Sequence, residues 1–180
     1  NGLFLMNMKT NSVRNIPYEA YSMGKWISGI VSDDRYVYLG TKDGVYRLGN
    51  DFKEEAHFTT NDGLPHNNIE HVLLDSKGRL LFATRSKGIY ELTREGTANL
   101  LYPVDRADVE FKSLAEDING NIWAATNGDG VICFKKDSVF QITVASGLKS
   151  DFCYSLISAR ENGICVGHRL GMSRINTLNM

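Results

Sequence analysis

The stretch that decides the fold runs from Asp62 to Leu92 and reads DGLPHNNIEHVLLDSKGRLLFATRSKGIYEL. Its opening turn, DGLP, is followed by three short apolar segments near 69–74, 79–84 and 89–92. These segments are rich in β-branched and aromatic residues and are bounded by Gly, Asp and Asn, which is typical of strands joined by tight turns. The stretch therefore predicts a meander of β-strands and disfavours helices.

The same pattern recurs along the chain with a nearly constant period. The glycine that opens the third predicted strand recurs at intervals of 41 to 44 residues, at Gly2, Gly44, Gly88, Gly130 and Gly171. The residue that closes the second predicted strand recurs at intervals of 42 or 43 residues, at Thr41, Thr84, Thr126 and His168. A repeat of roughly 40–45 residues with four short strands is the signature of a β-propeller blade.

We therefore predict an all-β fold of β-propeller blades, each a four-stranded antiparallel meander, with about four blade equivalents forming a single region over 1-180. The predicted boundaries are a partial blade at 2-17, blades at 26-60, 62-101 and 109-143, and a partial blade at 146-176. Because the chain enters and leaves within a blade, it can close as a four-bladed ring or form an arc of a larger, seven-bladed type propeller. We favour the arc, whose open edges need cover.

A small residue precedes the Thr or His position in every unit, and we expect neighbouring blades to approach closely there. These small residues are Gly40, Ala83, Ala125 and Gly167.

The composition narrows the classes of function. The chain has 20 basic and 21 acidic residues, mixed along its length, so it lacks the basic footprint of a protein that binds nucleic acid or an anionic membrane. No apolar run approaches the roughly 20 residues needed to span a bilayer. The spacing of the three cysteines, Cys133, Cys153 and Cys165, does not match a zinc site. We expect them to be buried free thiols, and the alternative is that two of them form a disulfide. Because the sequence begins with Asn1, we expect it to belong to a longer chain.

Three polar motifs resemble sites for a metal, calcium or phosphate, but each is better interpreted as an ordinary loop or turn. His66 and His71 are five residues apart, which does not fit the HExxH pattern of a zinc protease. The segment 117–121 begins like a calcium loop but lacks the required Gly and Glu further on, so we interpret it as a hairpin turn. The glycine-rich segment 127–130 precedes no helix that could bind a phosphate. We therefore expect no catalytic residue, no metal and no cofactor.

Varied polar loops on one face are the better candidates for binding. In a four-stranded meander, the loop between the second and third strands and the loop between blades emerge on the same face, and binding residues are often placed on such loops. We propose that this face contacts a glycan, including an acidic one, or a partner domain; the alternative is ordinary solvated loop charges. The candidates are Lys42, Asp43, His66, Asn67, Arg85, Lys87, Arg106, Asn127, Asp129, His168 and Arg169.

The repeat resembles the two-component-regulator propeller repeat, whose pattern is close to DGLP-x-N-x-V-x-x-I-x-x-D-x-x-G-x-L-W-I-G-T-x-x-G-L-Y-R-L. The segment 62–92 matches most of it, 116–126 with Gly130 matches in the third unit, and 38–48 matches in the first. The fourth unit departs from it, since His168 replaces Thr and its turn at 160–163 is short.

This resemblance implies the periplasmic sensor region of a hybrid histidine kinase from a Bacteroides-type bacterium. Such regions precede a further β-sandwich, a membrane helix and a kinase core, and often a DNA-binding regulator, and they usually respond to glycan fragments. We therefore expect a non-catalytic sensor propeller that contacts other blades and downstream domains, with membrane attachment only through the parent chain. The alternatives are a propeller-fold polysaccharide lyase or glycoside hydrolase, and a scaffold that forms a homodimer.

Overall fold

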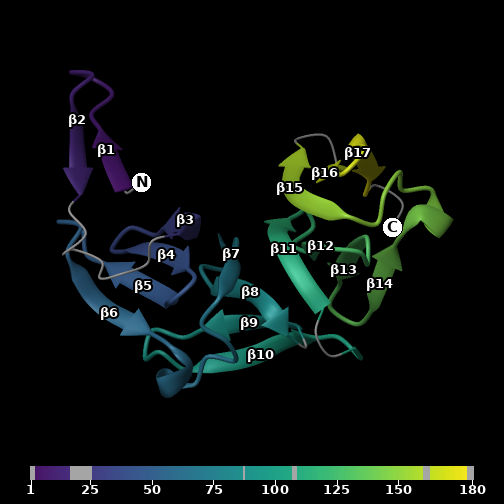
Figure 1. The fold of residues 1–180 in the computed structure, drawn as a ribbon, viewed down its shortest axis with the longest axis horizontal. Helices are drawn as coiled ribbons and strands as arrows, with labels where there is room; N and C mark the ends of the chain where they lie inside the picture. Colours follow the sequence, from purple (N-terminus) through teal and green to yellow (C-terminus); the bar gives the residue numbers. More distant parts are fainter. Residues whose placement is uncertain (1–2, 17–25, 87, 107–108, 160–162, 178–180) are drawn as a thin grey trace.

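The computed structural model describes residues 3–16, 26–86, 88–106, 109–159 and 163–177. Over these ranges the chain forms a succession of antiparallel sheets that fan out into an open arc (Figure 1). The first strand of each blade lies on the inner side of the arc, and the outer strands β6, β10 and β14 lie on its outer side (Figure 1). The all-β propeller architecture predicted from the sequence is confirmed.

Each blade follows the order of the sequence. A hairpin of β1 (Leu3–Met6) and β2 (Val13–Ile16) comes first. Blade one contains β3 (Ile27–Ser32), β4 (Val37–Thr41), β5 (Gly44–Leu48) and β6 (Glu54–Phe58). Blade two contains β7 (Ile69–Leu74), β8 (Leu80–Ser86), β9 (Gly88–Leu92) and β10 (Ala98–Pro103). Blade three contains β11 (Val109–Glu116), β12 (Ile122–Thr126), β13 (Val131–Phe134) and β14 (Val139–Ile142). Blade four contains β15 (Cys153–Ala159), β16 (Gly163–His168) and β17 (Gly171–Asn176).

We call the contacts between successive blades the first, second and third junctions. Each junction is filled by apolar side chains from the two facing sheets, and the second strands β4, β8 and β12 are buried over most of their length. At the first junction, a Cβ atom on Gly40 would lie only 3.0 Å from side-chain atoms of Ile69 and Val72. The close approach that we predicted at this position is therefore confirmed in blade one.

In blades one and three, the threonine that closes the second strand holds the turn that follows it. The Thr41 hydroxyl donates to the Gly44 carbonyl (2.9 Å) and accepts from the Asp43 amide (3.0 Å). Gly44 has a φ of 102°, a left-handed conformation that favours glycine. In blade four, His168 makes the matching contact to the turn, because its Nδ1 accepts from the Leu170 amide. Its Nε2 donates to Ser173 Oγ. The substitution of His for Thr thus preserves the turn.

The acidic turns between first and second strands are hairpin turns, as predicted. Asp117 is buried, and its Oδ1 accepts from the amides of Asn119 and Asn121 while its Oδ2 accepts from the indole of Trp123 (2.8 Å). Asp75 occupies the equivalent position in blade two and accepts from the Arg79 amide and guanidinium. The carboxylates of Asp117 and Asp75 therefore accept hydrogen bonds from residues of their own hairpins.

The two ends of the arc expose apolar side chains. Ile157 and Met172 of blade four are 66% and 71% exposed, and Phe4 of the first hairpin is 59% exposed. The faces of blades two and three, by contrast, are covered on both sides. Within the described ranges, no helix has the length and apolar character that crossing a bilayer requires.

The three cysteines are free thiols in the structure. Cys133 and Cys153 are buried, and burial raises the pKa of their thiols to about 12 and about 11 respectively. Cys165 is partly buried. The expectation of buried free thiols is confirmed for Cys133 and Cys153.

Candidate functional site

A β-bulge recurs near the start of the first strand in all four blades and places one extra residue there. The register shifts between Ile27 and Gly29 in blade one, and at the corresponding positions of the other three blades. The extra residues are Ser28, Glu70, Lys112 and Tyr154. Bulges change the direction of side chains and are frequent next to functional sites, so these residues on the inner side of the arc are candidates for a functional site.

Two of the extra residues meet at the second junction and form the core of a charged group. Lys112 Nζ lies 2.6 Å from Glu110 Oε1 and 3.2 Å from Glu70 Oε2, so one ammonium group bridges carboxylates from blades two and three. Asn68 Nδ2 donates to Glu70 Oε1 (2.9 Å), and Asn127 Nδ2 donates to Glu110 Oε2 (2.9 Å). We call Glu70, Glu110 and Lys112 the junction cluster.

The junction cluster is partly shielded from water, with side-chain exposures of 22%, 29% and 24% for Glu70, Glu110 and Lys112. The hydrogen bonds from Asn127 and Lys112 lower the pKa of Glu110. Burial disfavours the Lys112 ammonium, but its hydrogen bonds to Glu110 and Glu70 outweigh this effect and raise the Lys112 pKa. The Glu110 carboxylate and the Lys112 ammonium are therefore both charged at neutral pH.

This arrangement suits recognition better than acid–base catalysis. A general acid for glycoside hydrolysis needs a carboxyl group whose pKa is raised, so that it still holds its proton near neutral pH. The pKa of Glu110 moves in the opposite direction. Two carboxylates around one ammonium leave acceptor lone pairs that can bind the hydroxyl groups of a polar ligand.

Two residues predicted from the sequence, Arg85 and Asn127, lie at this junction. β8 extends beyond its equivalents and pairs with the start of β11, where Arg85 is opposite Glu110 and Ser86 is opposite Val109. The Asn127 amide also donates to the Glu110 carbonyl (2.9 Å). The pairing of β8 with β11 joins blades two and three into one eight-stranded sheet.

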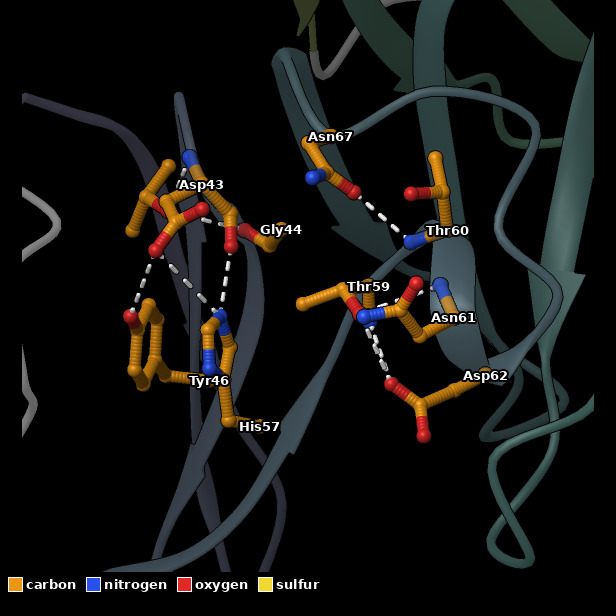
Figure 2. A network of polar contacts seen from close by, with 10 residues as sticks. Asp43, Gly44, Tyr46, His57, Thr59, Thr60, Asn61, Asp62 and Asn67 are labelled. Carbon is orange, nitrogen blue, oxygen red and sulfur yellow. Dashed lines mark hydrogen bonds and ion pairs between the residues drawn. The ribbon is translucent and has the colours of Figure 1, made fainter.

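Two other predicted residues, Asp43 and Asn67, serve the loops of blade one. Figure 2 shows the Asp43 carboxylate facing Tyr46 and His57, at 3.3 Å from the Tyr46 hydroxyl and 3.8 Å from His57 Nε2. The His57 ring stacks on Tyr46 and donates to the Asp43 carbonyl (2.5 Å). Asn67 Oδ1 accepts from the Thr60 amide (2.7 Å) in the loop between blades (Figure 2).

Blade three repeats most of this loop network with different residues. Gln141 Nε2 donates to the Asp129 carbonyl (2.6 Å), as His57 does to Asp43. Asp151 takes the place of Asn67 and accepts from the Val144 amide (2.8 Å). The backbone carbonyls of Asp43 and Asp129, with the side-chain oxygens of Asn67 and Asp151, therefore hold the loops in both blades. The carboxylate of Asp129 differs, because it pairs with Arg106 from the preceding loop.

The other described candidates lie in separate loops. Lys42 lies over the ring of Trp26 (5.1 Å), and Arg169 lies over the ring of Phe152 (5.7 Å). His66 is exposed, and its Nδ1 accepts from the Asn68 amide (2.8 Å). Lys87 lies outside the described residues. No group of three or more His, Cys, Asp and Glu side chains within the described ranges could hold a metal ion.

Sequence reasoning missed all three members of the junction cluster. Glu70 and Lys112 are 42 residues apart, and they stand inside segments that we interpreted as apolar strands. A signal was present, because a polar or charged residue directly follows the repeated apolar position Ile27, Ile69 or Phe111. These residues are Ser28, Glu70 and Lys112. That break in the apolar pattern marks the bulge.

The comparisons with known proteins agree on the fold. No protein-family model matches the sequence, and no curated protein matches it significantly. Among solved structures, the chain is similar to the extracellular domain of BT3049, described as a hybrid two-component system of B. thetaiotaomicron, with 20% identity and a TM-score of 0.82 over 99% of the chain. It is also similar to the extracellular domain of BT4673 from the same organism, with 19% identity and a TM-score of 0.79 over 97%.

A third similar structure has a different role, since virginiamycin B lyase of Staphylococcus aureus matches 88% of the chain with 15% identity and a TM-score of 0.61. The chain spans about a quarter of the length of the two extracellular domains, 25% and 24%, and 58% of the lyase. At these identities the similarity concerns the fold. The β-propeller is shared with extracellular domains of two-component systems, the class of protein that the repeat resembles.

Proposed function

We propose that this chain is part of a non-catalytic, extracytoplasmic sensor propeller of a two-component receptor, and that it binds a glycan fragment at the second junction. The junction cluster is the observation that carries this proposal, because charged side chains from two blades converge on the inner side of the arc. The similarity to two extracellular domains of B. thetaiotaomicron supports the sensor role and a periplasmic location.

The chemistry of the cluster favours a neutral glycan. Glu70 and Glu110 are balanced by Lys112 and Arg85, so the group has no net positive charge that would attract an acidic sugar. Sugar hydroxyl groups can donate to Glu70 and Glu110, and a free acceptor on the sugar can approach Arg85, which is exposed beside Glu110. We therefore narrow the acidic-glycan hypothesis to neutral oligosaccharides.

The contacts expected of the parent receptor follow from the ends of the arc. Exposed apolar residues such as Ile157, Met172 and Phe4 suit the cover that further blades of the same receptor would supply. A homodimer that covers the same faces is the competing scaffold hypothesis, and sedimentation of the chain distinguishes them by its molecular mass. Kinase and DNA-binding activities would belong to other domains of such a receptor.

An enzyme is the second candidate function, because the lyase of S. aureus shares the fold. The lowered pKa of Glu110 argues against a glycoside hydrolase that uses this residue as its acid. A turnover assay on neutral polysaccharides tests this alternative directly. We expect no product, and release of oligosaccharides that is lost in Glu110→Gln would favour the enzyme.

Binding to an immobilised panel of neutral and acidic oligosaccharides tests the sensor proposal. We expect the chain to bind neutral members, and Glu110→Gln and Lys112→Met to weaken that binding by about tenfold or more. Glu95→Gln is the matched control, since Glu95 is an exposed carboxylate in the turn between β9 and β10. Absence of binding to every glycan, or equal binding by all variants, would overturn the glycan proposal.

A further inference from the structure

A cavity of about 440 Å³ opens at the outer part of the second junction, away from the junction cluster. The apolar wall consists of Val104, Val109, Ile132 and Val139, and the charged residues Asp105, Arg106 and Asp129 line the same space. The volume falls within the roughly 300–1,000 Å³ of small-molecule sites. An apolar chamber with a few convergent polar groups is the usual form of such a site.

The cavity is lined by one residue, Ile132, that is smaller than its equivalents in the repeat. Ile132 stands where blades one and two have Tyr46 and Tyr90, and Ala124 stands where blade two has Phe82. At the first junction, Phe82 and Tyr90 stack with ring centroids 5.6 Å apart and fill the corresponding space. The second junction has an isoleucine and an alanine at these positions, so it contains less side-chain volume.

The substitution at Ile132, together with Gln141 in place of His57, leaves the carboxylate of Asp129 with a different partner. In blade one, the equivalent Asp43 carboxylate faces the Tyr46 hydroxyl and His57 Nε2 of its own blade. In blade three these positions are Ile132 and Gln141, and Gln141 binds the Asp129 carbonyl. The Asp129 carboxylate pairs instead with Arg106 Nη1 across the junction.

The Arg106–Asp129 pair has the features of a pair that a ligand can separate. The Arg106 side chain is 68% exposed, and its described contact uses Nη1, whereas a guanidinium group has five donors. An ion pair with one largely exposed partner contributes little to stability. An anionic ligand that pairs with Arg106 would leave Asp129 facing a second negative charge, and a cationic ligand that pairs with Asp129 would leave Arg106 facing a second positive charge. A ligand with both charges pairs with both residues.

We propose that this cavity binds a zwitterionic amino acid with an apolar side chain. Its carboxylate pairs with Arg106, its ammonium group pairs with Asp129, and its side chain contacts Val109, Ile132 and Val139. The residues involved are separate from Glu70, Glu110 and Lys112, so this site stands independently of the glycan proposal.

Calorimetric titration of the 180-residue chain with L-phenylalanine and L-leucine tests the proposal. We expect saturable binding with a dissociation constant on the order of 1 mM or lower for ligands of this size. N-acetyl-L-phenylalanine and L-phenylalaninamide each lack one charge, and each should bind about tenfold or more weakly. Equal binding of the amino acid and both derivatives would overturn the assignment of the two charges.

Variants connect each charge of the ligand to its residue. Arg106→Gln should abolish the preference for the acid over the amide, and Asp129→Asn should abolish the preference for the free amine over the acetylated form. Ile132→Tyr restores the tyrosine of blades one and two and should eliminate binding by filling the cavity. Lys136→Gln removes an exposed cation from the turn after β13 and should leave binding unchanged.

Thermal unfolding of every variant shows that it is folded before its affinity is compared. No saturable heat with either amino acid, or unchanged affinity in folded Ile132→Tyr, would overturn the site. Loss of amino-acid binding without loss of glycan binding would separate this cavity from the junction cluster.

Discussion

The first and second junctions are built from the same repeat positions but differ in what fills them. The first junction contains the stacked rings of Phe82 and Tyr90. On the other face of blade one, Asp43 and His57 lie against Tyr46 and bind within their own blade. The second junction has Ala124 and Ile132 at the positions of Phe82 and Tyr90, and it has charged pairs that cross from one blade to the next. The Asp43 and Asp129 carbonyls accept equivalent hydrogen bonds in both blades, so this contact supports the loops. Their carboxylates have different partners in the two blades, so the carboxylate is the better candidate for ligand recognition.

Removing the aromatic filling of the first junction should have the largest effect. Phe82→Ala gives this junction the alanine that the second junction has at Ala124. Because Phe82 is fully buried, we expect the free energy of unfolding to fall by about 3–5 kcal/mol, measured by chemical denaturation.

Leu100→Ala is the control for this measurement, since Leu100 is 45% exposed and its loss should change stability by about 0.5 kcal/mol or less. A loss below about 1 kcal/mol in Phe82→Ala would mean that the first junction closes over the missing ring. The contrast between the two junctions would then not depend on their aromatic residues.

Removing the bridging ammonium of the second junction should have an intermediate effect. Lys112→Met leaves Glu70 and Glu110 near one another without a countercharge, and we expect a loss of about 1–2 kcal/mol, since the group is neither fully buried nor fully exposed. Denaturation of Lys112→Met, Glu70→Gln and the double variant gives the coupling between Lys112 and Glu70. If the double variant loses the sum of the two single losses, the ion pair between Lys112 and Glu70 contributes nothing to the free energy of unfolding.

Acidification should have the smallest effect, also at the second junction. Burial lowers the pKa of His71, whose Nδ1 accepts from the Leu114 amide (3.3 Å) of blade three. The unfolded chain, with a His71 pKa near 6.5, therefore takes up this proton more readily than the folded chain. The stability supplied by neutral His71 is present above about pH 6.5 and is lost as the pH falls through the lower folded-state pKa.

His71→Asn isolates this contribution, because the asparagine oxygen can still accept from Leu114 but does not titrate. We expect the stability advantage of wild type over the variant to fall between pH 7.5 and 5, measured by denaturation at each pH. A difference that is constant over this range would exclude His71 as a source of pH dependence. The first junction has Gly29 at the corresponding position, so it contributes no such term.

The sequence by itself determined the period, the strand segments, the acidic hairpin turns and the polar loop face. These features depend on residues that are close in the chain, such as Asp75 with Gly78 or Thr41 with Gly44, so local patterns are sufficient to predict them. The sequence also placed Arg85 and Asn127 among the candidates at the face where both are found.

Only the tertiary structure decided which of these polar residues meet and which are used by their own blade. Glu70 and Lys112 are one repeat apart, and they come together because the bulges re-aim them and stacking places successive blades side by side. Asp43 and Asp129 occupy the same repeat position, but Tyr46 and His57 face the first while Arg106 pairs with the second. A periodic pattern defines equivalent positions, and the neighbours that distinguish them come from another blade, where no local pattern can indicate them.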